Sequence, residues 1–135
     1  PAVFMPKDLA ARTYLTELNL DYLIDFMSGD RYPLPRWHRS DAEACAQLYK
    51  NFLWLNKRYG AQALVPTREI DEFWHNHILY TRAYVRDCLA IFGHYFHHEP
   101  SPPDEDPAVL IDNYLATKAL YLAEFGEVLA LQRQS

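Results

Sequence analysis

The sequence predicts an all-α fold, organised as a single helical domain over residues 1–135. Apolar residues recur at the spacing of amphipathic helices, and no segment shows the alternation and turn dipeptides typical of strands. Glycine is scarce, with four residues, and stands mainly where helices are expected to end. Half of the residues are hydrophobic, which is enough for one core in a chain of this length. We therefore expect an irregular bundle of about four to five helices.

The first two helices are predicted from an apolar stripe and a capping pattern. One is expected over residues 7–27, with a break near Asn19 as an alternative. The next is expected over residues 40–59, after a loop that contains prolines. Ser40 and Glu43 form a capping-box pattern at its start.

The third predicted helix is a long central one over residues 67–93, with acidic residues in its first turns as the helix dipole favours. Pro66 precedes its start, and a glycine marks its end. The last helix is expected over residues 107–125, because Asp106 is a capping residue and Pro107 suits the first helical position.

Composition excludes several classes of function. The net charge of −5 argues against nucleic-acid binding, which needs clustered basic residues. No apolar run approaches the roughly 20 residues of a membrane span, and the start shows no signal-peptide pattern. Cys45 and Cys88 have no CxxC partners, so we expect both to be reduced and buried, in a cytoplasmic protein.

Histidine is the unusual component of the sequence. The chain has six histidines, and five of them lie between His75 and His98. At about 100° per residue, Asp71 and His75 share one face of a helix, whereas His77 lies on the apolar flank. His77 is therefore expected to be a core histidine, and His75 to belong to a polar site.

A metal site is the more specific interpretation of Asp71 and the clustered histidines. Asp71 and His75 supply two ligands from one helix, and His97 or His98 could fold back from a loop to add a third. Such a set suits a divalent ion, Zn²⁺ first and Fe or Cu as alternatives. Asp71 would be either a ligand or the group that orients the His75 ring. A plain surface hydrogen bond between these two side chains is the competing interpretation.

Proton transfer at such a site would be carried by Glu72 or Tyr84. The sequence leaves both hydrolysis and oxidation open. It contains no HExxH, GxSxG, P-loop, GxGxxG or CxxCH motif. Glu72 and His75 form one ExxH pair, but a di-iron carboxylate site needs a second such motif, and none is found.

One segment resembles a known family. The run IDEFWHNHI at residues 70–78 resembles the IDxxWHxHI signature of the glycine-rich domain-containing protein-like family. The resemblance continues through Tyr84, Asp87-Cys88, Phe92-Gly93 and His97-His98-Glu99-Pro100 to Tyr121 and Phe125-Gly126-Glu127. It covers about half of the chain. No glycine-rich tail is present, so the chain resembles a stand-alone, bacterial-type version of the shared domain.

The resemblance brings no established reaction with it. It does favour a functional site over a surface accident, because its polar positions are rich in metal-ligand residue types. These positions are Asp71, His75, His77, Tyr84, Cys88, His97 and His98.

Two hypotheses from different classes follow. The first is a metal-binding helical domain, with a possible role as a small hydrolase or oxidoreductase acting on an unknown small molecule. The second is a non-catalytic interaction module with structural histidines, which would dock a protein partner through the acidic loop 99–106 and exposed aromatics such as Trp37. A third option is a pH-sensitive module, since clustered histidines titrate near neutrality.

Overall fold

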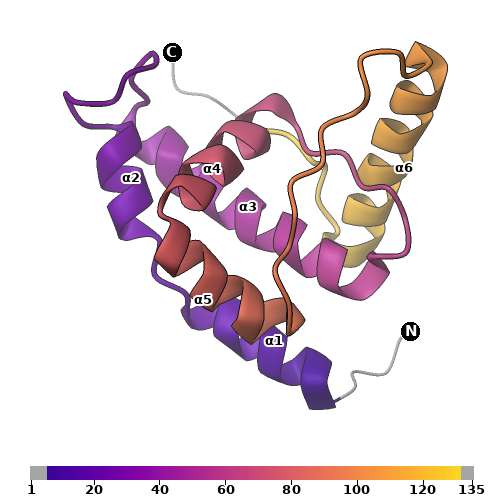
Figure 1. Cartoon of the computed structure of the whole chain (residues 1–135), viewed down its shortest axis with the longest axis horizontal. Helices are drawn as coiled ribbons and strands as arrows, with labels where there is room; N and C mark the ends of the chain where they lie inside the picture. The colour runs from indigo at the N-terminus through magenta and orange to yellow at the C-terminus, as the bar shows by residue number, and fades with distance from the viewer. Residues whose placement is uncertain (1–5, 132–135) are drawn as a thin grey trace.

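The computed structural model describes residues 6–131, and within that range it contains six helices and no strand. The all-α prediction is confirmed, with an irregular bundle as the architecture (Figure 1). The helices are α1 (Pro6–Glu17), α2 (Asp21–Met27), α3 (Arg39–Tyr59), α4 (Arg68–Leu79), α5 (Thr81–Phe92) and α6 (Pro107–Phe125).

Helix α3 is the centre of the bundle. It runs through the middle of the molecule and contacts α1, α2, α4 and α6 (Figure 1). Its apolar side chains are buried along most of its length, so it is covered from several directions. Aromatic residues dominate the core that results, because one large ring removes much apolar surface from water. The largest fully buried side chains are Trp54, Tyr49, Tyr84, Tyr121, Phe52 and Phe73.

The segment predicted as one helix over residues 7–27 is two helices, with the break near Asn19 that the sequence allowed. The Asn19 side chain accepts a hydrogen bond of 2.8 Å from the backbone N–H of Asp21. An asparagine that bonds the backbone two residues ahead favours a turn over a continuing helix.

The capping-box prediction at Ser40 is wrong. Helix α3 begins one residue earlier, at Arg39, and His38 occupies the N-cap position without a side-chain capping bond. At the other end of the chain the capping prediction is confirmed. The Asp106 side chain accepts from the N–H of Ala108, and Pro107 follows at the start of α6.

The single long helix predicted over residues 67–93 is also wrong, so the WHxH motif lies on a short helix, and α3 is the long central one. The chain breaks at Tyr80, whose backbone angles of φ −85° and ψ 70° are not helical. No proline or glycine marks this break. The Tyr80 ring instead packs edge-on against Tyr22 and Phe26 of α2, at centroid distances of 5.0 and 6.2 Å. We attribute the break to this tertiary contact, which is invisible to local helix signals.

One carboxylate of α6, that of Glu124, bonds three residues of α3. Glu124 accepts hydrogen bonds from Trp54 at 2.8 Å, Arg58 at 2.9 Å and Tyr59 at 3.0 Å. Burial alone would raise the pKa of Glu124, but these donors hold it below the ordinary value.

Two further expectations have clear outcomes. Cys45 and Cys88 are free and buried, as expected. Trp37 is not an exposed docking residue, because only 6% of its surface is accessible and its indole N–H donates to Glu72 at 2.8 Å. Among the helices of residues 6–131, none is both long enough and apolar enough to cross a membrane.

Candidate metal centre

Helix α4 presents the first two residues of the site. Its N-terminus is capped by Thr67, whose hydroxyl accepts from the Ile70 N–H at 3.2 Å. The helix is amphipathic, with Ile70 and Phe73 in the core and the opposite side turned outward. Asp71 and His75 lie one turn apart on the outward side, as the helical spacing predicts, with 3.7 Å between Asp71 Oδ2 and His75 Nδ1.

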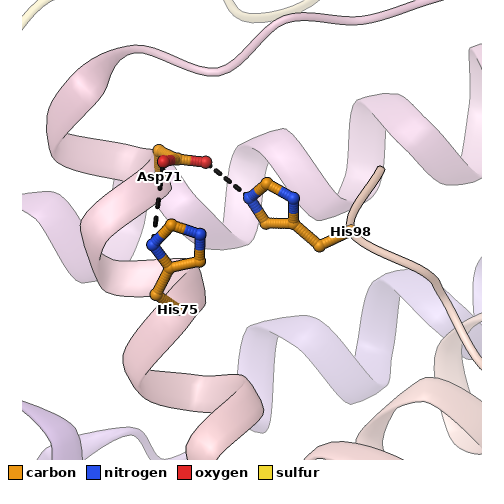
Figure 2. Close-up of side chains that lie close together, drawn as sticks. All are labelled: Asp71, His75 and His98. Atoms are coloured by element: carbon orange, nitrogen blue, oxygen red, sulfur yellow. Dashed lines mark hydrogen bonds and ion pairs between the residues drawn. The ribbon is translucent and has the colours of Figure 1, made fainter. Parts of the chain in front are cut away.

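The third residue is His98, which arrives from the segment between α5 and α6. Its Nε2 atom lies 2.6 Å from Asp71 Oδ1, so a residue 27 positions away closes the site (Figure 2). Asp71, His75 and His98 each offer one ligand atom, and these atoms all lie within 4.8 Å of one another. In a tetrahedral zinc site the ligand atoms lie about 3.4 Å apart, which is within the spacing of these three atoms.

Ring stacking holds His98 in place. Its ring lies 4.1 Å from the ring of Trp74 and 4.6 Å from that of His75, the latter pair being nearly parallel. Exposure of the side chains is graded, at 16% for His98, 35% for Asp71 and 57% for His75. The cluster is thus fixed on its inner side and open to solvent on its outer side.

The segment that carries His98 is itself anchored to the core. Phe96 stacks on Trp74 at a centroid distance of 5.1 Å and on Phe92 at 4.5 Å. The buried Tyr84 hydroxyl donates to the Phe96 carbonyl and accepts from the Trp74 indole N–H at 2.9 Å. Tyr84 therefore ties helix α5, helix α4 and this segment together, two residues before His98.

The donor set fits a first-row divalent metal ion. Two imidazole nitrogens and one carboxylate oxygen are ligands that Zn²⁺, Fe²⁺ and Cu²⁺ accept, and this set does not choose among them. Three protein ligands leave coordination positions open for water or another molecule, as in catalytic rather than structural zinc sites.

The structure separates the two adjacent histidines that the sequence offered together. His98 joins Asp71 and His75, whereas His97 is exposed and packs against the Tyr95 ring at 4.7 Å. His97 does not belong to the group of converging ligand atoms. It lies on the wall of a neighbouring pocket instead.

Glu72 and Tyr84, the expected proton carriers, are both engaged elsewhere. The Glu72 carboxylate accepts hydrogen bonds from the hydroxyl of Tyr32 and the indole of Trp37, and it is not part of the converging group. Burial raises the pKa of Tyr84 above its ordinary value, so its hydroxyl stays protonated. The contacts of both side chains are those of positioning residues.

The buried position of His77 in the core is confirmed. The polar network around it could not be predicted from the sequence. His77 Nδ1 lies 2.6 Å from the Tyr49 hydroxyl, and its Nε2 lies 2.8 Å from Asp87 Oδ2. The Asp87 carboxylate also accepts from the Tyr14 hydroxyl and from Arg86. Nothing in the local pattern pairs His77 with Asp87, because ten residues of straight helix would hold them roughly 15 Å apart.

The network sets the ionisation of its carboxylate. Burial alone would raise the pKa of Asp87, but the hydrogen bonds from His77 and Tyr14 outweigh it, and the pKa lies below the ordinary value. The carboxylate is therefore charged at neutral pH. It accepts from His77 Nε2–H, while the Tyr49 hydroxyl donates to Nδ1.

A pocket of about 550 Å³ adjoins the converging residues, and no sequence pattern predicts it. Asp71 and His98 are on its wall together with Trp74 and Phe96. A ligand in this pocket would therefore lie beside Asp71 and His98, two of the three residues that would hold a metal ion.

Comparison with known proteins assigns the chain to a family. A family model described as UCP032817-like matches residues 21–106, which is more than half of the chain. The chain belongs to this family. The UCP032817-like match spans α2 to α5 and includes Asp71, His75 and His98.

Two plant proteins are similar to this UCP032817-like chain. Glycine-rich domain-containing protein 2 of Arabidopsis thaliana is 28% identical over 134 residues, which is 93% of this chain and 17% of the plant protein. Glycine-rich domain-containing protein 1 of the same plant is 32% identical over 89 residues, 62% of this chain and 11% of the plant protein. The resemblance drawn from the sequence is thus confirmed. The chain spans less than a fifth of either relative, and no solved structure matches it significantly.

Proposed function

We propose that this protein is a metal-binding domain in which Asp71, His75 and His98 hold one divalent ion, Zn²⁺ before Fe²⁺ or Cu²⁺. The convergence of these three ligand atoms within 4.8 Å is the observation that carries the proposal. Two of them are neighbours on one helix by necessity, but the third comes from a distant segment. Helical spacing alone brings Asp71 and His75 together on a surface, but it does not explain why His98 lies beside them.

The surroundings of His98 support the same conclusion. Four aromatic contacts and the Tyr84 hydrogen bonds fix the segment that carries it, so the ring is held in place before any ion binds. Preorganised ligands bind a metal more tightly because less conformational entropy is lost on binding. Asp71 contacts both histidines, so it serves as the shared ligand or as the group that orients them.

Catalysis is the finer part of the proposal. An ion held by three protein ligands has open positions, and two of the ligands also line the pocket. A metal in this place would polarise a bound ligand or activate a water molecule. Glu72 and Tyr84 support the site by fixing the core around α4, and proton transfer would fall to metal-bound water or to His97 on the pocket wall.

The test is metal stoichiometry in protein purified without a histidine tag. We expect one Zn²⁺ per chain after equilibration and dialysis, measured by mass spectrometry. His98→Ala and His75→Ala should each weaken binding by more than about 100-fold, beyond the loss typical of partners that only hydrogen-bond to ligands. Co²⁺ absorption in the visible range would report the coordination number.

The matched control is His97→Ala, which removes an exposed imidazole next to His98 and should leave the stoichiometry unchanged. Substoichiometric metal that does not respond to His98→Ala would overturn the proposal.

The interaction-module hypothesis retains one supporting observation. Helix α6 exposes large apolar side chains, among them Ile111, Leu115 and Leu122, which are 50–56% accessible. Exposed apolar surface of this kind is typical of protein contacts. This face lies on a different helix from the metal residues, so both roles can coexist, and metal stoichiometry alone decides the first.

A further inference from the structure

The pocket beside Asp71 and His98 has one arginine that forms no ion pair with any carboxylate of residues 6–131. Arg68 is the first residue of α4 and lies on the pocket wall three residues before Asp71, on the same side of the helix. Its side chain is exposed, and within residues 6–131 its guanidinium has no hydrogen-bond or ion-pair partner. Asp71 is directed to His75 and His98 instead.

The charge of the loaded site favours a single negative charge on the ligand. A divalent ion held by one carboxylate and two neutral imidazoles leaves a net charge of about +1. Arg68 adds a second positive charge on the same wall, while Glu99 adds a negative one. A monoanion balances this sum, whereas a dianion would be repelled by Glu99 more strongly.

The remaining wall is largely apolar. Leu64, Val65 and Pro66 come from the segment before α4, and Phe96 and Pro100 come from the segment before α6. The volume of about 550 Å³ lies within the range of small-molecule sites, which combine apolar walls with a few fixed polar groups. A hydrated inorganic anion would leave these walls uncovered.

We propose that the pocket binds a small organic monocarboxylate, with its carboxylate between the metal ion and Arg68 and its apolar body against Leu64, Val65 and Phe96. A planar guanidinium matches a carboxylate well, because two parallel N–H groups can bond two oxygens. The inference rests on the proposed metal site, since the ion supplies half of the recognition of the carboxylate.

Calorimetry on Zn²⁺-loaded protein tests the inference, with phenylacetate as the probe. We expect phenylacetate to bind, acetate to bind at least about 10-fold more weakly for lack of an apolar body, and 2-phenylethanol not to bind measurably. Arg68→Gln should weaken phenylacetate binding about 10-fold or more, as expected for a lost hydrogen bond to a charged group. Glu99→Gln should strengthen phenylacetate binding, because it removes a negative charge from the pocket wall.

A matched control separates pocket charge from overall charge. Arg82→Gln removes an exposed arginine on α5, outside this pocket, and should leave phenylacetate affinity unchanged. Leu64→Ala should weaken phenylacetate binding and leave acetate binding unchanged, which tests the apolar wall independently.

Failure of the inference is distinct from failure of the metal site. Zn²⁺ uptake with no phenylacetate binding, or with binding that ignores Arg68→Gln, would overturn the carboxylate inference and leave the metal proposal standing. Tighter binding of inorganic phosphate than of phenylacetate would overturn it too. Absence of Zn²⁺ uptake is measured before any probe is added, and it would overturn the metal proposal itself.

Discussion

His75 and His77 stand two residues apart on α4, yet they lie in opposite environments. The His75 side chain is 57% exposed and faces Asp71 and His98, whereas the His77 side chain is 1% exposed and lies between Tyr49 and Asp87. Two residues along a helix rotate the side chain by about 200°, so the same residue type faces the surface at one position and the core at the other.

The difference separates a histidine of the buried core from a histidine of the candidate site. The hydrogen-bond partners of His77 come from α3 and α5, and Tyr14 of α1 bonds the same Asp87 carboxylate, so the buried network joins four helices. The partners of His75 are Asp71 on its own helix and His98 in the segment between α5 and α6, whose ring stacks on that of His75. Loss of the first histidine should therefore act on folding, and loss of the second on ligand binding.

The largest expected effect is that of His77→Ala. It leaves the buried Asp87 carboxylate without the donor to its Oδ2 atom and the Tyr49 hydroxyl without its acceptor. We expect the free energy of unfolding to fall by about 3–5 kcal/mol, as for other broken buried pairs. Urea denaturation followed by circular dichroism measures it.

His75→Ala is the matched control for this comparison. In metal-free buffer it should change the free energy of unfolding by no more than about 0.5 kcal/mol, as is usual for exposed positions. Equal destabilisation by the two variants would contradict the division between a structural and a functional histidine.

The next effect concerns pH. The pKa of Asp87 is lower in the folded protein than its ordinary value, so the folded state binds fewer protons than the unfolded state as acid is added. Its stabilisation is complete above the ordinary pKa of about 3.9 and is lost as the pH falls through the lower folded value. Asp87→Asn should therefore cost about 1.5–3 kcal/mol at pH 7, the scale of hydrogen bonds to charged groups.

The difference in the free energy of unfolding between wild type and Asp87→Asn should narrow as the pH is lowered from about 5 toward about 2.5. Urea unfolding at each pH measures it. Asp104→Asn changes an exposed loop position, so its free energy of unfolding should depend on pH in the same way as that of wild type. A gap that stays constant over this range would show that Asp87 acts by shape and not by charge.

The smallest effect is expected at Tyr84, which connects the buried core to the segment that carries His98. Tyr84→Phe removes the acceptor of the Trp74 indole and the donor to the Phe96 carbonyl. We expect a loss of about 1–3 kcal/mol in the free energy of unfolding from these unpaired groups. Zn²⁺ affinity should fall by less than the roughly 10–100-fold found for direct partners of metal ligands, because Tyr84 acts through the segment that carries His98.

Tyr95→Phe removes a hydroxyl from an exposed tyrosine of the same segment and should leave both quantities unchanged. A Tyr84→Phe protein with reduced stability but unaltered Zn²⁺ affinity would show that the core and the site are independent.

Much of the fold could be predicted from local patterns. Capping at Asp106, the break near Asn19 and the helix end at Gly93 each depend on a few neighbouring residues. The break at Tyr80 could not be predicted in this way, because the ring contacts that accompany it come from α2, more than fifty residues earlier. The missed break also hid the pairing of His77 with Asp87.

The sequence by itself determined that this chain is helical and that Asp71 and His75 share a face, because helical spacing fixes both within one turn. Only the tertiary structure decided that His98 and not His97 completes the cluster. Adjacent residues of an irregular segment point in different directions, and their choice depends on Trp74, Phe96 and Tyr84, which meet only when the chain has folded. The same packing places Arg68 on one pocket wall with Asp71 and His98.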